Sequence, residues 1–217
     1  EIVFENDLFV ILNKPHGLLV HPTDSSDEYT LRDFLIENFN ISDVGEYKRE
    51  GIVHRLDRVT SGLIVCPINT DAFNQLQEDF KKRKIIKKYK AIIQGSLRSK
   101  SGEINLPLIH SQNNRRKREV GKNGREAITK YNTISKTDSY TLLDIDLITG
   151  RNHQIRAHFE YLKAPIVNDT LYGAKKVSEL NQNTICLQSY NIEFKLFDKD
   201  YKFSINEPDY FTSIMNM

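Results

Sequence analysis

Apolar residues alternate or recur at helical spacing along most of this chain, and their pattern predicts a series of short elements. The opening FENDLFVILNKPHGLLVHP predicts a strand pair, with residues 9–12 as the second strand before a loop broken by Pro and Gly. Thr30 can cap a helix that runs to about residue 39, because apolar residues follow it at helical spacing. A polar loop over residues 40–50 completes this part of the chain.

The next predicted elements are a buried strand over residues 63–66 and a helix over about 70–82. The helix carries apolar residues at positions i, i+3 and i+7, which is typical of a face turned to the core. In KKYKAIIQG, Tyr89, Ala91 and Ile93 alternate with Lys and Ile, which predicts a strand with one apolar face.

The second half of the chain is richer in strands. A basic, hairpin-like excursion covers about 98–124, and strands follow at 127–135 and 140–148. TGRNHQIRAHFEYL turns into a helix, and IEFKLF and YKFSI form a hairpin across 198–200. Many strands, few helices and no regular βαβ alternation predict an α+β fold with a mixed, mainly antiparallel sheet.

Composition narrows the class of protein. The 217 residues are enough for one domain with a sizeable core or for two small ones, and 39% hydrophobic with 28% charged residues fits a folded globular protein. We expect a single domain over residues 1–217. No apolar run reaches the roughly 20 residues that span a membrane, and the acidic, strand-like N-terminus does not resemble a secretory signal. Cys66 and Cys186 lie in apolar segments without metal-ligand spacing, so we expect buried free thiols, a reducing compartment and a cytoplasmic protein.

Charge is distributed unevenly although the formal net charge is only +2. Residues 81–90, KKRKIIKKYK, hold seven cations and no acid, and residues 115–118 read RRKR. Two such clusters favour a track for a polyanion such as nucleic acid. Solvated lysine-rich loops explain the same runs, so both interpretations stay open here.

HRLDRVTSG at residues 54–62 is the segment where chemistry is expected. It lies between two apolar runs, a pattern that suits a carboxylate, Asp57, held in a cleft. A buried carboxylate needs an opposite charge to stay ionised, and Arg156 can supply it through two parallel hydrogen bonds. Tyr89 can stack on a base beside its neighbouring lysines. The alternatives are a capping or surface Asp57 and a core Tyr89.

Other kinds of site find little support. No pair of histidines forms a metal set with an acid, no glycine-rich loop would cradle a phosphate, and Ser61 lacks an adjacent base. One carboxylate, one arginine and one aromatic residue beside basic tracks therefore predict a reaction on nucleic acid without metal or cofactor. They do not name the reaction.

The motifs of the chain, in order, resemble those of the RluA-type pseudouridine synthases. NKPHGLLVHP, GIVHRLDRVTSGLIV and KKYKAIIQG are followed by LPLIH, EAITKY, TGRNHQIRAH and PIVNDTLYG, over nearly the whole length. The resemblance implies the fold of that family, a bent sheet flanked by helices and loops around a central active-site cleft. Relatives often carry an N-terminal RNA-binding domain, and we expect none in this chain.

The same resemblance assigns roles to residues. Asp57 is the catalytic aspartate, Arg156 its ion-pair partner and Tyr89 the tyrosine that stacks on the target uracil. Arg55 enters the space that the flipped nucleotide leaves, and Leu187 lines the pocket, followed by Gln188 where relatives often have His. The candidate substrate contacts are Arg55, His54, Thr60, Leu187, Arg151, Lys87 and Lys88.

The implied reaction isomerises uridine to pseudouridine in RNA, needs no cofactor and requires the stacked uridine to flip out. Large-subunit ribosomal RNA is the expected substrate, with transfer RNA as the alternative, and the protein is expected to act as a monomer. Two rivals remain: an RNA-binding module without activity, and a glycosylase that releases free uracil.

Overall fold

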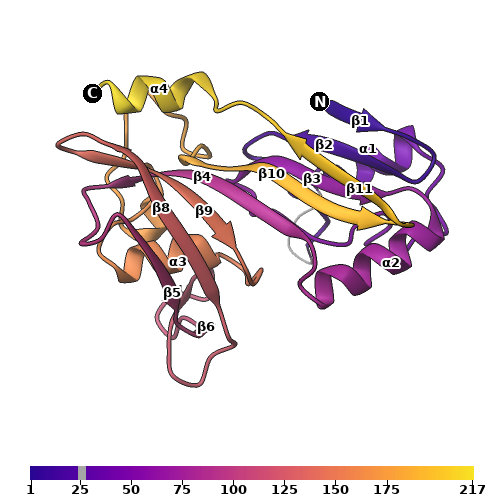
Figure 1. Ribbon diagram of the computed structural model, residues 1–217, viewed down its shortest axis with the longest axis horizontal. Coiled ribbons are helices and arrows are strands. Elements are labelled where there is room, and N and C mark those ends of the chain that lie inside the picture. Colours follow the sequence, from indigo (N-terminus) through magenta and orange to yellow (C-terminus); the bar gives the residue numbers. More distant parts are fainter. Residues whose placement is uncertain (24–27) are drawn as a thin grey trace. The chain divides into compact units, whose positions relative to one another are not determined.

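The computed structural model describes residues 1–23 and 28–217, which form two compact units (Figure 1). Unit 1 comprises residues 1–85 and 191–205, and unit 2 comprises residues 86–190 and 206–217. The division into units does not test the expectation of a single catalytic domain over residues 1–217, which stays a prediction. None of the helices in the described residues has the length and apolar character needed to cross a bilayer.

Unit 1 is a sheet with two helices. Its elements are β1 (Ile2–Glu5), β2 (Phe9–Lys14), α1 (Leu31–Asn38), β3 (Ser61–Pro67), α2 (Thr70–Lys81), the later part of β10 (Leu187–Leu196) and β11 (Lys199–Ser204). The strand order is β1-β2-β3-β10, and β11 pairs with β10. The β1–β2, β2–β3 and β10–β11 pairs are antiparallel.

Both helices of unit 1 begin where the sequence predicts. Thr30 caps α1 in a capping box, in which its hydroxyl and the carboxylate of Asp33 each accept from the other's backbone N–H. Asn69 caps α2, since its side chain accepts from two backbone N–H groups of the first turn. These caps satisfy donors that a helix start otherwise leaves without a partner.

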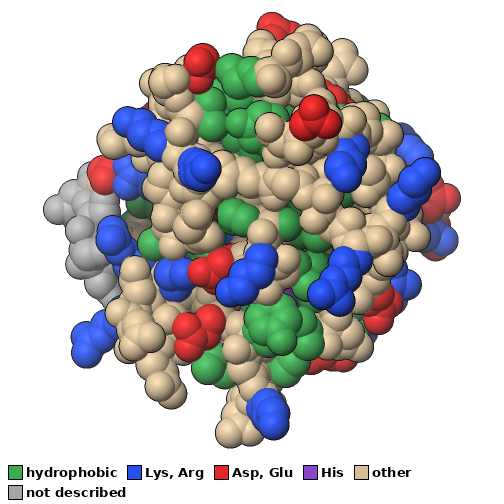
Figure 2. Space-filling model, turned by 90° about the vertical axis from the view of Figure 1, so that its left-hand side faces the viewer, with side chains coloured by type: hydrophobic (Ala, Val, Ile, Leu, Met, Phe, Trp, Pro, Cys, Tyr) green, Lys and Arg blue, Asp and Glu red, His purple; other side chains and the backbone are tan. Residues whose placement is uncertain are grey.

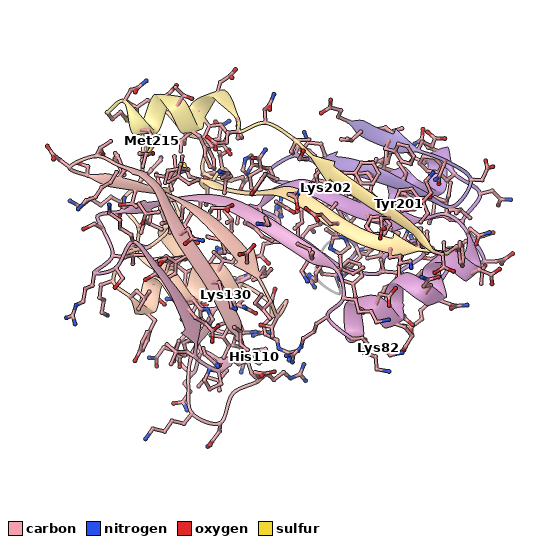
Figure 3. All side chains as sticks on the ribbon, in the orientation of Figure 1. Lys82, His110, Lys130, Tyr201, Lys202 and Met215 are labelled. Carbon is pink, nitrogen blue, oxygen red and sulfur yellow. The ribbon has the colours of Figure 1, made fainter. Side chains whose placement is uncertain are left out.

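The core of unit 1 lies between α2 and the sheet. Leu76 of α2 packs in one cluster with Phe9, Leu63 and Phe194 from the strands. The ring of Tyr201, labelled in Figure 3, meets that of Phe9 edge-on, with ring centroids 4.9 Å apart. Edge-to-face contacts of this kind add to the burial of apolar area.

The turn between β10 and β11 differs slightly from the prediction. It was expected at 198–200, but β11 already begins at Lys199 and the turn residues are Phe197 and Asp198. Both have positive φ, 46° and 63°. Two consecutive left-handed residues match the twist of the strands they connect, so the two-residue turn is favoured over the longer one.

Unit 2 contains a four-stranded antiparallel sheet, a separate two-stranded hairpin, the start of a further strand and two helices. Its elements are β4 (Ile86–Gln94), β5 (Ser101–Asn105), β6 (Leu108–His110), β7 (Arg118–Val120), β8 (Ile128–Lys136), β9 (Tyr140–Leu147), α3 (Gln154–Tyr161), the 3₁₀ turn η1 (Thr170–Tyr172), the start of β10 and α4 (Asp209–Met215). The order β4-β9-β8-β5 is antiparallel throughout, and β6 and β7 form a separate hairpin.

The helices of unit 2 pack by apolar side chains. Phe159 of α3 contacts Tyr131 of β8, and Phe211 and Ile214 of α4 join the core cluster of Ile92 and Leu142. The sequence did not predict α4, which is only seven residues long. The predicted α+β class with a mainly antiparallel sheet is confirmed.

Candidate active site

The turn that carries Asp57 is fixed to the loop after β2 by backbone contacts. The N–H of Thr60 donates to the carbonyl of Asp57 at 3.0 Å, which closes the turn. From the NKPHG segment, Gly17 N–H donates to the carbonyl of Arg58 at 2.8 Å, and Nδ1 of His16 lies 2.8 Å from the carbonyl of Val59. The two motifs at residues 13–17 and 54–62 therefore form one local structure inside unit 1.

Lys14 is the residue that sequence reasoning missed in this structure. Its side chain is 1% exposed, and Nζ donates to the carbonyls of Pro15, Leu18 and Arg58 at 2.9, 2.9 and 3.3 Å. Burial lowers the pKa of Lys14 to about 7, the negative charge of Asp57 opposes that shift, and the charge of Arg58 adds to it. Lys14 and Asp57 thus share one electrostatic environment.

Arg55 and His54, the neighbours of Asp57, have different surroundings. Arg55 is exposed, and Nη1 of its guanidinium lies 3.2 Å from Nε2 of His21, whose Nδ1 contacts the carbonyl of Pro22. His54 instead accepts from the N–H of Val65 and stacks on the ring of Phe80, with centroids 4.4 Å apart. The contacts of His54 favour a structural role, whereas the side chain of Arg55 is exposed.

Two hydroxyl residues follow the turn. Thr60 is 3% exposed and Ser61 is 7% exposed at the start of β3. The Ser61 Oγ is buried without a hydrogen-bond partner in the described part of the chain. Burying a polar atom without a hydrogen-bond partner lowers the stability of the fold. A buried hydroxyl of this kind is uncommon, and here it lies directly after the turn of Asp57.

In unit 2, strand β4 presents Lys87 and Tyr89 on one face and Lys88 on the other. Tyr89 is 5% exposed and lies opposite Ile145 of β9. Lys88, on the alternate face, forms an ion pair with Asp146 at 3.3 Å. Lys87 shares the face of Tyr89, and burial lowers the pKa of its ammonium to about 8.

Arg156 has a partner that sequence reasoning did not foresee. Its Nε and Nη2 donate to the two carboxylate oxygens of Asp169 at 2.7 and 2.9 Å. Both side chains are nearly fully buried, with 5% and 2% exposure. The predicted pair of Arg156 with Asp57 joins residues of separate units and stays a prediction. PIVNDTLYG contains Asp169, but nothing in its spacing marked it as an ion-pair partner.

The remaining candidates lie at element ends in unit 2. Arg151 precedes α3, and its Nε donates to the carbonyl of Glu126 at 2.9 Å. Leu187 begins β10 and is 3% exposed. The next side chain, Gln188, donates from Nε2 to the carbonyl of Asn206, while its Oε1 is buried without a partner within the described residues.

The basic run of residues 81–90 is partly neutralised where it follows α2. Lys81 and Lys82 both lie 3.3 Å from carboxylate oxygens of Glu78, and Lys84 pairs with Asp79 at 3.2 Å. Lys82, labelled in Figure 3, lies at the end of the helix. Because of these ion pairs, the local charge at the end of α2 is smaller than the run of lysines indicates. On a different side of the molecule, seen in Figure 2, Lys and Arg side chains are spread out among Asp and Glu.

A metal-binding cluster and a pocket that could hold a ligand are two further kinds of candidate site. Among the described residues, no three His, Cys, Asp or Glu side chains gather as a metal would require. A pocket of roughly 320 Å³ in unit 1 is lined by Gln75, Asp79, Lys84, Ile85, Lys195 and Asp198. It contains none of the candidate site residues.

Comparison with known proteins adds the family context. Residues 8–161 match the sequence model of the family described as RNA pseudouridylate synthase. The chain is 37% identical to ribosomal large subunit pseudouridine synthase D of Borreliella burgdorferi, over 95% of this chain and 64% of that protein. It is 34% identical to an RNA pseudouridine synthase of Aquifex aeolicus, over 98% and 71% of the two chains. The chain spans a little under two thirds of the Borreliella protein.

Solved structures agree with these sequence matches. The human RNA pseudouridylate synthase domain containing 4 aligns with a TM-score of 0.77 and 25% identity, over 97% of this chain and 90% of that one. Human RNA pseudouridylate synthase domain containing 1 aligns with a TM-score of 0.76 and 22% identity, over 96% and 83%, which supports the fold alone.

Proposed function

Because the chain belongs to the RNA pseudouridylate synthase family, we propose that it isomerises uridine to pseudouridine in large-subunit ribosomal RNA. The bond from N1 of uracil to C1′ breaks, the base rotates, and C5 bonds to C1′. The proton on C5 is lost and N1 gains one, so no group is transferred and no redox partner is required.

The observation that carries this proposal is the rigid turn of Asp57. Three residues of the NKPHG segment, Lys14, His16 and Gly17, bond the carbonyls next to it, so the carboxylate is held without flexible linkers. A fixed carboxylate beside a buried ammonium suits attack on the sugar or removal of a proton from it. In either route Asp57 acts as an anion.

The other roles follow the family resemblance. Tyr89 stacks on the uracil, Arg156 keeps Asp57 ionised, and Arg55 fills the space that the flipped base leaves. Arg55 is exposed and contacts His21, which supports its role in filling the space of the flipped base. The substrate contacts are completed by Thr60, Leu187, Arg151, Lys87 and Lys88, with His54 as a residue that supports the turn.

We further propose that the protein is cytoplasmic, because its two cysteines are free and buried, as expected in a reducing compartment. We also propose that it acts as a monomer. Basic side chains near the site bind RNA phosphates and offset the cost of unstacking the uridine. Transfer RNA is the alternative substrate.

The test measures tritium released from ribosomal and transfer RNA pools labelled at C5 of uridine. The parent protein should release tritium from ribosomal RNA, Asp57→Asn should release none, and Asp198→Asn should match the parent because Asp198 is 97% exposed. Unchanged turnover in Asp57→Asn contradicts the assignment of Asp57. Binding without release from any RNA favours an idle binding module, and free uracil as product favours a glycosylase.

A further inference from the structure

Tyr172 is fully buried in unit 2, yet its hydroxyl takes part in two polar contacts. It accepts from the N–H of Arg118 in β7 at 2.9 Å, and it lies 2.9 Å from Nδ1 of His153 at the start of α3. The N–H of Arg118 can only donate, so the hydroxyl accepts from it and keeps its own proton. The hydroxyl can donate this proton to Nδ1 of His153. The hydroxyl therefore connects the β6–β7 hairpin to the N-terminus of α3.

The ring of Tyr172 is also shared between two cations. Lys117 Nζ, on the hairpin, and Arg156 Cζ, on α3, each lie 4.8 Å from the ring centroid. Each cation has its own carboxylate, Glu160 at 2.6 Å for Lys117 and Asp169 for Arg156. Buried cation–π contacts of this kind are among the stronger ones.

Arg156 is thus positioned from two directions. Asp169 holds one edge of the guanidinium, and the ring of Tyr172 contacts it. The N–H of Tyr172 donates to the carbonyl of Asp169 at 2.9 Å, so partner and ring belong to one turn. Any shift of the ring therefore moves the support of Arg156.

The hairpin, defined as residues 108–120, offers two exposed cations at its tip, Arg115 and Arg116. Its base is fixed to Tyr172 by Lys117 and by the N–H of Arg118, and Nη1 of Arg118 contacts Nδ1 of His110, which Figure 3 labels. Arg115 and Arg116 are therefore followed directly in the chain by the two residues that contact Tyr172, Lys117 and Arg118.

We propose that Tyr172 is a positioning residue that couples RNA binding at the hairpin to the orientation of the Arg156 guanidinium. This inference rests on the proposed function, in which Arg156 supports the catalytic aspartate. It assigns to the hairpin an effect on kcat in addition to its contribution to binding. The hydroxyl is the connection, because it accepts from the hairpin backbone at Arg118 and lies beside His153 at the start of α3.

The test is a double-mutant cycle between Tyr172→Phe and the hairpin variant Arg115→Gln/Arg116→Gln, with kcat and KM measured for tritium release from ribosomal RNA. Tyr172→Phe should lower kcat about tenfold, as expected for loss of a buried, bonded hydroxyl. The hairpin variant should lower kcat and raise KM in the parent. In the Tyr172→Phe background it should still raise KM but leave kcat unchanged.

Controls separate coupling from loss of structure. Tyr131→Phe removes a hydroxyl from another buried tyrosine of unit 2 and should leave kcat at the parent value. If Tyr172→Phe fails to fold, Lys117→Met replaces it, since that change removes a hairpin contact and leaves Tyr172 intact. Additive effects on kcat overturn the coupling. A parent protein without activity instead overturns the proposed function, so the two failures are distinguishable.

Discussion

Replacing Asp169 by Asn should strongly destabilise unit 2, because it removes the carboxylate that accepts two hydrogen bonds from the buried guanidinium of Arg156. The pair is 5% and 2% exposed and bonded at 2.7 and 2.9 Å. An amide keeps one acceptor but turns an NH₂ group toward the second guanidinium nitrogen. Losing charge-assisted bonds of about 1.5–3 kcal/mol each, and breaking a buried ion pair, gives about 3–5 kcal/mol.

The measurement is urea unfolding followed by circular dichroism, with thermal unfolding as a second readout. A loss of this size lowers the unfolding temperature by roughly 6 °C or more for a chain of this length. Asp198→Asn is the matched control, since it makes the same change in an exposed ion pair and should leave the midpoint at the parent value.

A second variant tests the reason for the loss. Replacing both residues by apolar ones, Arg156→Met with Asp169→Leu, removes the two charges of this pair together. This double variant should destabilise the protein less than Asp169→Asn alone. Both variants should be inactive in tritium release. The reasoning is refuted if Asp169→Asn loses less than about 1 kcal/mol, or if the double variant is the less stable of the two.

Three further predictions concern other parts of the chain. The pKa of Lys14 is lowered from 10.5 to about 7, so above pH 7 the unfolded chain holds a proton that the folded one has released. The contribution of this group to stability therefore rises with pH. The unfolding free energy of the parent minus that of Lys14→Met should increase from pH 7 to about 9.5, and a constant difference contradicts this. A Cβ at Gly124 would lie 2.5 Å from backbone atoms of Leu108, so Gly124→Ala should lower the unfolding temperature, whereas Gly150→Ala, with open space around it, should not. Neutralising Lys81–Lys84 should weaken RNA binding with a smaller salt dependence and leave the fold intact by circular dichroism; loss of folding would show a structural role.

Local patterns in the sequence were sufficient for most elements. Thr30 marked the start of α1, and the apolar spacing around Leu76 marked α2, because caps and amphipathic faces depend on residues within a few positions of each other. The alternation around Tyr89 gave β4 for the same reason. The short α4 and the two-residue turn at Phe197 were not foreseen, since packing and strand twist favour them more than local composition does.

The sequence by itself also determined the motif at which we expect the chemistry, HRLDRVTSG, and the order of motifs that identifies the family. The sequence did not determine which side chains contact each other across the fold. Only the tertiary structure decided that Asp169 bonds Arg156, that Lys14 is buried beside the turn of Asp57, and that His54 packs on Phe80. Spacing along a chain records neighbours three or four residues apart, whereas a buried charge selects its partner from whatever the fold brings within hydrogen-bond distance.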